Sequence, residues 1–141
     1  MGVPPKTPKP SRTKSRLAPP DALKREVQTA FDPGEAQPKY RSGFGRYDGL
    51  AYIGAEAYFH LAGGYDSGLH PMQLKYRGKS HWWLVDSEDR VIDLVLGPRE
   101  TSKFPYHRGR RRPFRYTPAG ISRAAQQIRD GVREARGTAA A

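Results

Sequence analysis

The chain has no cysteine among its 141 residues, which excludes disulfide bonds and thiolate metal sites. It contains no apolar run of membrane-spanning length, and no apolar segment follows the positively charged N-terminus as it does in a secretory signal. Acidic residues are scarce, because 14 Asp and Glu stand against 25 Lys and Arg, for a formal net charge of +11. We therefore expect no membrane association and a cytoplasmic location, or host cytoplasm or a virion if a phage encodes the protein.

The excess of positive charge favours anionic partners, so nucleic acid or an acidic protein is expected to bind the basic segments. Residues 1–20 are rich in Pro, Lys and Arg and nearly free of apolar side chains, which predicts a disordered tail. This tail is either an arm that lies on a polyanion or a solubilising extension without a partner. Residues 21–136 are expected to form a single α+β domain, and residues 137–141 a frayed C-terminus. The oligomeric state is left open.

The middle of the chain predicts a β-hairpin. Residues 80–85 and 91–94 are rich in β-branched and aromatic side chains, and the polar residues 86–90 separate them. If the two ends of that loop pair, alternation places His81 and Asp93 on the same face as diagonal neighbours. A loop one residue longer or shorter would put them on opposite faces. An Asp that orients a His is the supporting half of a nucleophilic triad, so the hairpin predicts a candidate catalytic site.

Apolar spacing predicts helices at residues 21–31, 48–61 and 117–136, and alternation predicts a strand at residues 72–76. Side chains that can cap the three helix starts are Asp21, Asp48 and Thr117, the last followed by Pro118. The middle helix is expected to bury one face that carries Leu50, Ile53 or Gly54, Ala57 and Leu61. The predicted architecture is a helix packed on a small antiparallel sheet, with an amphipathic helix at the C-terminus.

Residues 104–116 interleave aromatic side chains with five arginines, and they are the best nucleic-acid candidate in the chain. The arginines expected to contact phosphate are Arg108, Arg110, Arg111, Arg112 and Arg115. An equally weighted alternative is a solvated loop whose aromatic side chains pack inward. His60, His70 and His107 lack the spacing of metal ligands, so neither a metal nor a cofactor is expected.

Three short motifs resemble those of papain-like and transglutaminase-like thiol enzymes. Residues 49–57 resemble a Gly-x-Cys-Tyr-x-Ala-x-Glu-Ala helix, and residues 80–82 and 91–93 match its Ser-His-Trp and Ile-Leu-Asp signatures. This pattern is similar to that of small phage and actinobacterial proteins. The resemblance covers about residues 48–95 and departs at the nucleophile, because Ala51 stands where the family has Cys.

The resemblance implies a role for each matching residue. Ala51 occupies the nucleophile position, His81 is the general base and acid, and Asp93 orients the imidazole. A thiol in the first turn of a helix would be activated by unpaired backbone N–H groups and by the adjacent His. Candidates for oxyanion or substrate contacts are Arg46, Tyr47 and Trp82.

Two function classes follow. The first is a hydrolase or acyltransferase scaffold that acts on amide or ester bonds of a peptide or protein as a protease, deamidase or transglutaminase-like enzyme. It is inactive in this chain because Ala51 lacks sulfur. The chain is either an enzyme altered to abolish reaction or a natural pseudoenzyme, and the retained His and Asp favour the former. The second class is a non-enzymatic basic protein that binds nucleic acid or joins a virion or nucleoprotein assembly.

Overall fold

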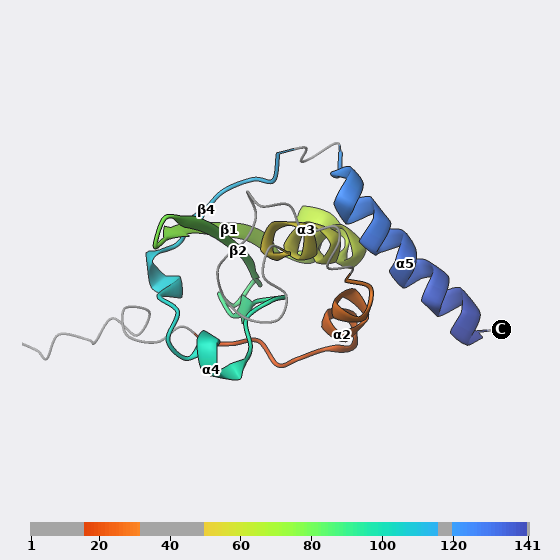
Figure 1. Ribbon diagram of the computed structural model, residues 1–141, viewed down its shortest axis with the longest axis horizontal. Coiled ribbons are helices and arrows are strands. Elements are labelled where there is room, and N and C mark those ends of the chain that lie inside the picture. The colour runs from red at the N-terminus through yellow and green to blue at the C-terminus, as the bar shows by residue number, and fades with distance from the viewer. Residues whose placement is uncertain (1–15, 32–49, 116–119, 141) are drawn as a thin grey trace, which may run out of the picture.

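The computed structural model describes residues 16–31, 50–115 and 120–140, and it shows an α+β arrangement (Figure 1). Helices pack on a small antiparallel sheet and a long helix ends the chain, so the predicted fold class is confirmed. The elements in chain order are α2 (Ala22–Thr29), α3 (Ala51–Ala62), the 3-10 turn η3 (Gly64–Ser67), β1 (His70–Tyr76), β2 (Lys79–Val85), β3 (Val91–Ile92), α4 (Pro98–Thr101), the 3-10 turn η4 (Tyr106–Arg108), β4 (Arg110–Arg111) and α5 (Arg123–Ala140).

The sheet has the strand order β3-β2-β1-β4, and the pairings between these four strands are antiparallel. Strands β1 and β2 are joined by a two-residue turn in which Arg77 and Gly78 both have positive φ, 52° and 78°. That geometry is typical of a tight hairpin, because it matches the twist of the flanking strands. Residues 16–18 run along β3, where the Ala18 amide donates to the Val91 carbonyl at 2.8 Å. Contacts with the sheet therefore begin upstream of residue 21, the expected start of the domain.

Helix α3 lies at the centre of the fold, and all its residues from Ala51 to Phe59 are buried. The prediction of one buried face was too narrow, because the sequence of this helix is apolar on nearly every side. A Cβ added at Gly54 would come within 2.7 Å of the Phe31 ring and 3.2 Å of Leu94 Cβ. Glycine is therefore required where α3 approaches these neighbours, and Gly63, with φ of 114°, ends the helix as predicted.

The flanking helices confirm one predicted cap and correct another. Asp21 caps α2, since its Oδ1 accepts a hydrogen bond from the Lys24 amide at 2.8 Å. Helix α5 begins at Arg123, so the predicted start at residue 117 is wrong; Thr117 and Pro118, like Asp48, lie outside the described residues. The start is displaced because Ser122 supplies the cap: its Oγ accepts from the Ala125 amide at 3.2 Å.

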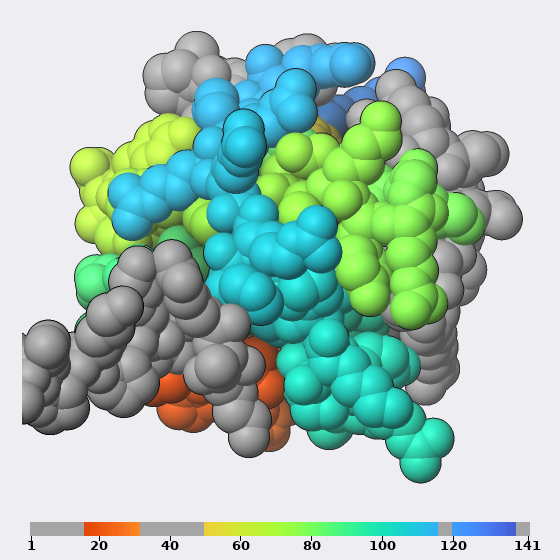
Figure 2. Space-filling model, turned by 90° about the vertical axis from the view of Figure 1, so that its left-hand side faces the viewer, coloured from red at the N-terminus to blue at the C-terminus, as the bar shows by residue number. Residues whose placement is uncertain are grey.

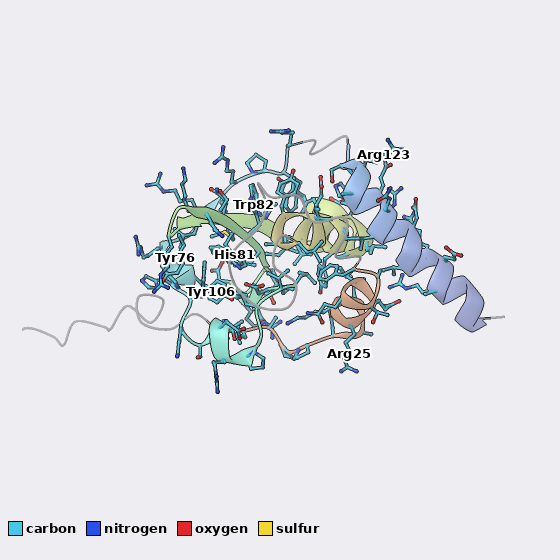
Figure 3. The ribbon with its side chains drawn as sticks, viewed as in Figure 1. Arg25, Tyr76, His81, Trp82, Tyr106 and Arg123 are labelled. Atoms are coloured by element: carbon cyan, nitrogen blue, oxygen red, sulfur yellow. The ribbon has the colours of Figure 1, made fainter. Side chains whose placement is uncertain are left out.

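The two faces of β2 meet different parts of the chain. His81 and Trp83 lie on one face, where Phe104 packs on the two rings at centroid distances of 4.7 and 5.6 Å. Trp82 projects from the opposite face, where its ring meets Tyr52 of α3 at 4.9 Å. Figure 3 shows His81 and Trp82 on either side of the strand. The candidate catalytic face of β2 is therefore the one covered by the segment that follows β3.

Candidate active site

His81 and Asp93 form a hydrogen-bonded pair in the protein interior. Nε2 of His81 lies 2.7 Å from Oδ2 of Asp93, and each side chain is 1% exposed. The predicted register produces this contact, because Leu84 pairs with Ile92 and Val85 with Val91. The hairpin and the contact between its two candidate residues are thus confirmed, whereas their catalytic roles remain predictions.

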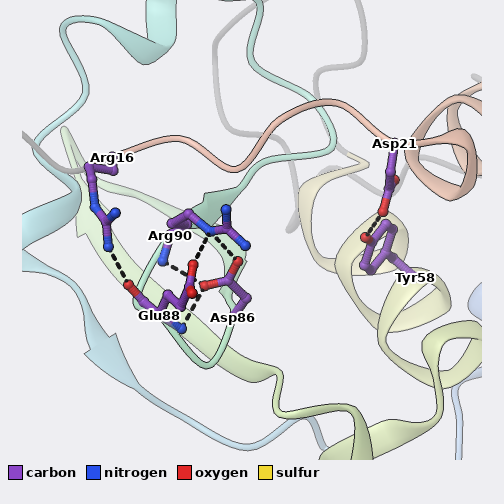
Figure 4. A network of polar contacts seen from close by, with 6 residues as sticks. All are labelled: Arg16, Asp21, Tyr58, Asp86, Glu88 and Arg90. Carbon is purple, nitrogen blue, oxygen red and sulfur yellow. Dashed lines mark hydrogen bonds and ion pairs between the residues drawn. The ribbon is translucent and has the colours of Figure 1, made fainter.

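The loop of the hairpin fixes that register through its own polar contacts (Figure 4). The Asp86 amide donates to the Arg90 carbonyl at 3.0 Å, which closes a loop of three residues. Oδ1 of Asp86 accepts from the backbone amides of Glu88 and Arg90, both at 2.9 Å. The Arg90 guanidinium binds Oδ2 of Asp86 at 2.8 Å, and Arg16 donates to the Glu88 carbonyl at 2.8 Å. Because a shift of one residue would reverse every side chain of β3, these contacts determine that Asp93 meets His81.

The Asp93 carboxylate accepts hydrogen bonds from four donors. Oδ1 accepts from the backbone amides of Val95 and Leu96, both at 2.9 Å. Oδ2 accepts from Nε2 of His81 and from the Tyr106 hydroxyl, the latter at 2.8 Å. Tyr106 is thus a third member of a His81–Asp93–Tyr106 cluster that sequence reasoning missed. Only the long-range fold brings Tyr106 here, and its position within the basic aromatic segment had suggested a different role.

The charge state of the cluster follows from these contacts. Burial alone would raise the pKa of Asp93, but the adjacent His81 and the backbone donors outweigh it and hold that pKa below its usual range. Burial, followed by the negative charge of Asp93, raises the pKa of Tyr106, so its hydroxyl remains a donor. An ionised Asp93 accepts the proton on Nε2 of His81. In the neutral form of an imidazole that donates from Nε2, the free lone pair is on Nδ1.

Nδ1 of His81 is buried and has no hydrogen-bond partner among the residues that the structure describes. The ring lies against aromatic side chains, 4.7 Å from Phe104 and 5.8 Å from Trp83 between ring centroids. Buried polar atoms are usually paired, so an unpaired acceptor indicates a strained or functional site. An imidazole whose other nitrogen is held by an ionised carboxylate can accept a proton at this atom and stabilise the resulting charge.

Ala51 is the first residue of α3 and is 1% exposed. Leu50 precedes it and makes no side-chain cap, so within the part of the chain that the structure describes its N-cap supplies no acceptor to the backbone N–H groups of the first turn. The Tyr52 ring of this turn contacts the Trp82 ring, on the β2 face opposite to His81. The approach of Ala51 to His81 therefore remains a prediction.

Among the described residues, the remaining oxyanion or substrate candidate, Trp82, points from the face of β2 opposite to His81. Arg46 and Tyr47 lie outside the described residues. In the basic segment the aromatic side chains pack inward: Phe104, Tyr106 and Phe114 are 8%, 5% and 2% exposed. The interpretation in which these rings stack on bases is therefore wrong for these three. The arginines of the segment are exposed, namely Arg108, Arg110, Arg111, Arg112 and Arg115.

Within residues 16–31, 50–115 and 120–140, no group of three or more His, Asp and Glu side chains is arranged to hold a metal ion. No helix in these ranges combines the length and apolarity needed to cross a membrane. Comparisons of the chain with family models, curated proteins and solved structures found no match. The resemblance to thiol enzymes therefore rests on the residues themselves.

Proposed function

We propose that the chain carries the His–Asp half of a thiol hydrolase or acyltransferase site, with Ala51 in the nucleophile position, and that it is inactive in this form. Its parent reaction is attack of a thiolate on an amide or ester bond of a peptide or protein. The observation that carries the proposal is His81: Nε2 is held by buried Asp93, and Nδ1 has no partner among the described residues.

The proposed chemistry assigns each nitrogen of His81 one task. Nε2 donates to Asp93, whose ionised state favours imidazolium once the ring gains a second proton. Nδ1 is the atom that would take the proton from a thiol. The exclusion of water from the pair, at 1% exposure on each side, strengthens the interaction between ring and carboxylate.

The position of Ala51 supports the same proposal from the helix side. A thiolate at the first residue of α3 would meet N–H groups that the preceding Leu50 leaves without a side-chain acceptor. Alanine differs from cysteine only by the sulfur atom, so the fold can be retained while the reaction is lost. The rest of the proposal requires that the residue 51 side chain reach Nδ1 of His81.

The proposal is tested by titrating the thiol of the Ala51→Cys variant. The chain has no cysteine of its own, so the thiolate absorbance near 240 nm reports on this residue alone. We expect a pKa well below the ordinary value of about 8.5 and a return toward it in Ala51→Cys/His81→Ala. Asp93→Asn should have a smaller effect, because Asp93 orients the imidazole whereas His81 supplies the charge. Absorbance requires no reagent to reach a buried side chain.

Ala124→Cys is the matched control, since Ala124 is half-buried in the first turn of α5. It reports the effect of a helix start alone on a thiol pKa. We expect that pKa to be lowered less in Ala124→Cys than in Ala51→Cys. Circular dichroism verifies that each variant is folded. A residue 51 thiol with a pKa near that of free cysteine, unmoved by loss of His81, would falsify the proposal.

A further inference from the structure

A cleft of about 330 Å³ lies on the other face of β2, away from the His81–Asp93–Tyr106 cluster. The described residues that line it are Tyr52, Gln73, Ser80, Trp82, Arg112, Pro113 and Arg115. Gln73 pairs with Trp82 across β1 and β2, so both side chains belong to the face opposite to His81. The cleft is a separate site, and its volume lies in the range of small-ligand pockets.

Backbone contacts fix the arginine-bearing wall of this cleft. Strand β4 pairs with β1, and the Arg112 amide extends that pairing with a 3.1 Å hydrogen bond to the Pro71 carbonyl. The Phe114 ring is 2% exposed and packs 5.5 Å from the Trp82 ring. The Arg115 amide donates to the Tyr52 hydroxyl at 2.8 Å. The wall is therefore formed before any ligand arrives, which lowers the entropic cost of binding.

The cleft carries positive charge that the described residues leave unneutralised. Nη1 of Arg112 lies 3.4 Å from the neutral Oε1 of Gln73. Among the described residues, no carboxylate is within 4.0 Å of the Arg112 or Arg115 guanidinium. No acidic side chain is among the described lining residues. Arg110 is exposed in β4, where it pairs with Gln73, whereas Arg111 pairs with Met72 and lies 3.8 Å from Asp89. Figure 2 shows the segment that contains these arginines, coloured cyan to light blue, crossing the surface beside the green β1–β2 hairpin.

The floor of the cleft adds features that distinguish among anions. Trp82 is half-buried and contributes indole surface, whereas the Trp83 ring is fully buried. Gln73 and Ser80 form a polar rim, with Nε2 of Gln73 donating to Oγ of Ser80 at 3.0 Å. A flat aromatic surface beside guanidinium groups suits a ligand that has both a planar ring and a phosphate. The Trp82 ring is stacked with Phe114 and meets Tyr52 edge-on, and the rest of its surface lines the cleft. An acidic peptide would use the arginines but not this indole surface.

We propose that this cleft binds one nucleotide unit of single-stranded nucleic acid, with the base against Trp82 and phosphate at Arg112 and Arg115. Arg110, which pairs with Gln73 of the cleft face, continues the phosphate path beyond the cleft. This site does not depend on the proposed thiol chemistry, which concerns the opposite face of β2.

Tryptophan fluorescence offers a local readout, because the chain has only two tryptophans and Trp83 is 0% exposed. Titration of the full chain with a ten-nucleotide oligothymidylate should quench the fluorescence. Anisotropy of the labelled oligomer measures affinity independently. We expect Trp82→Leu to abolish the quenching and to weaken binding by about 5- to 150-fold, the range measured for loss of one base-stacking ring.

Arg112→Gln/Arg115→Gln should lower the salt dependence of binding by about 1.4 in log–log slope, as expected for two phosphate contacts of a single strand. Arg123→Gln/Arg133→Gln is the matched control, because it removes the same charge from exposed positions of α5. Equal losses in the two double variants would show unspecific attraction to a basic surface and overturn the proposal.

Two further ligands test the chemical class. Thymidine monophosphate should bind more weakly than the oligomer, because it lacks the neighbouring phosphates; equal affinity would overturn the assignment to nucleic acid. Polyglutamate should neither quench Trp82 nor compete with the oligomer at equal charge concentration. Full competition without quenching would identify an acidic protein as the partner instead.

Discussion

Removal of the Asp93 carboxylate should destabilise the protein more than any other single change in the hairpin. In Asp93→Ala, the donors on His81, Tyr106, Val95 and Leu96 all lose their acceptor. Asp93→Asn keeps a side-chain oxygen for the two backbone amides, but it loses the negative charge and requires His81 and Tyr106 to rearrange. The two variants therefore separate the loss of hydrogen bonds from the loss of charge.

The magnitude follows from the number of orphaned groups. Each buried donor without a partner costs about 1–3 kcal/mol, but these costs overlap because the groups share one site. We expect Asp93→Ala to lower the free energy of unfolding by about 3–5 kcal/mol, as for breaking a buried ion pair. Asp93→Asn should lower it by about 1.5–3 kcal/mol. Against a typical total of about 5–15 kcal/mol, the first change leaves a marginal fold.

Urea unfolding followed by tryptophan fluorescence measures both values, and Asp130→Ala is the control. Asp130 is 64% exposed in its contact with Arg129, so its loss should change stability by less than about 1 kcal/mol. The free energy of unfolding should also depend on pH in a defined direction. Because the pKa of folded Asp93 is lowered, its contribution is present above the unfolded value of about 3.9 and is lost as pH falls through the folded value. An Asp93→Ala protein within about 1 kcal/mol of the parent at pH 7 would refute the view that this carboxylate organises the core.

Three other changes test neighbouring features by the same unfolding assay. Tyr106→Phe keeps the ring but removes a donor to Asp93, so it should cost about 1.5–3 kcal/mol; no loss would mean that the hydroxyl bond is unimportant. Gly109→Ala places a Cβ 2.3 Å from the Trp83 ring and should cost about 1–3 kcal/mol, whereas Gly137→Ala meets nothing within 4 Å and should be neutral or stabilising. Burial raises the pKa of Glu56 despite its hydrogen bonds from Ser122, so its contribution to stability is present below the unfolded pKa of about 4.3 and is lost as pH rises through the folded pKa. Glu56→Gln cannot ionise and should remove this pH-dependent contribution. An unchanged pH profile of stability would contradict this assignment.

The hairpin could be predicted from sequence because its information is local. Alternating side chains and a short polar loop determine the register, and the register alone brings His81 to Asp93. The same holds for α2, whose capping residue Asp21 stands next to the helix it begins. Helix α3 was predicted within three residues at its start, and Gly63 ended it as expected.

The features that sequence reasoning missed depend on contacts between distant segments. Tyr106 reaches Asp93 only after η4 folds over the sheet, and β4 exists because residues 110–111 find the free edge of β1. Glu56 and Ser122 are 66 positions apart, and their contact moves the start of α5 past residue 117. No local pattern marks these pairings, because neither partner has an unusual sequence neighbourhood.

The alternation of β2 makes the two proposals independent, since adjacent residues of one strand face opposite sides. His81 faces Asp93 and Tyr106, whereas Trp82 faces Tyr52 and the arginine-lined cleft. An unperturbed pKa of the residue 51 thiol would not argue against nucleotide binding in the cleft. Absence of nucleic-acid binding would not argue against the proposed role of His81. Helix α3 contributes a residue to each proposed site, because Ala51 and Tyr52 are consecutive in its first turn. If both proposals hold, oligomer binding beside Tyr52 should shift the pKa of the residue 51 thiol upward, because phosphate brings negative charge near a thiolate. Repeating the absorbance titration of Ala51→Cys with and without oligothymidylate measures that coupling, and an unchanged pKa would show that the two faces act separately.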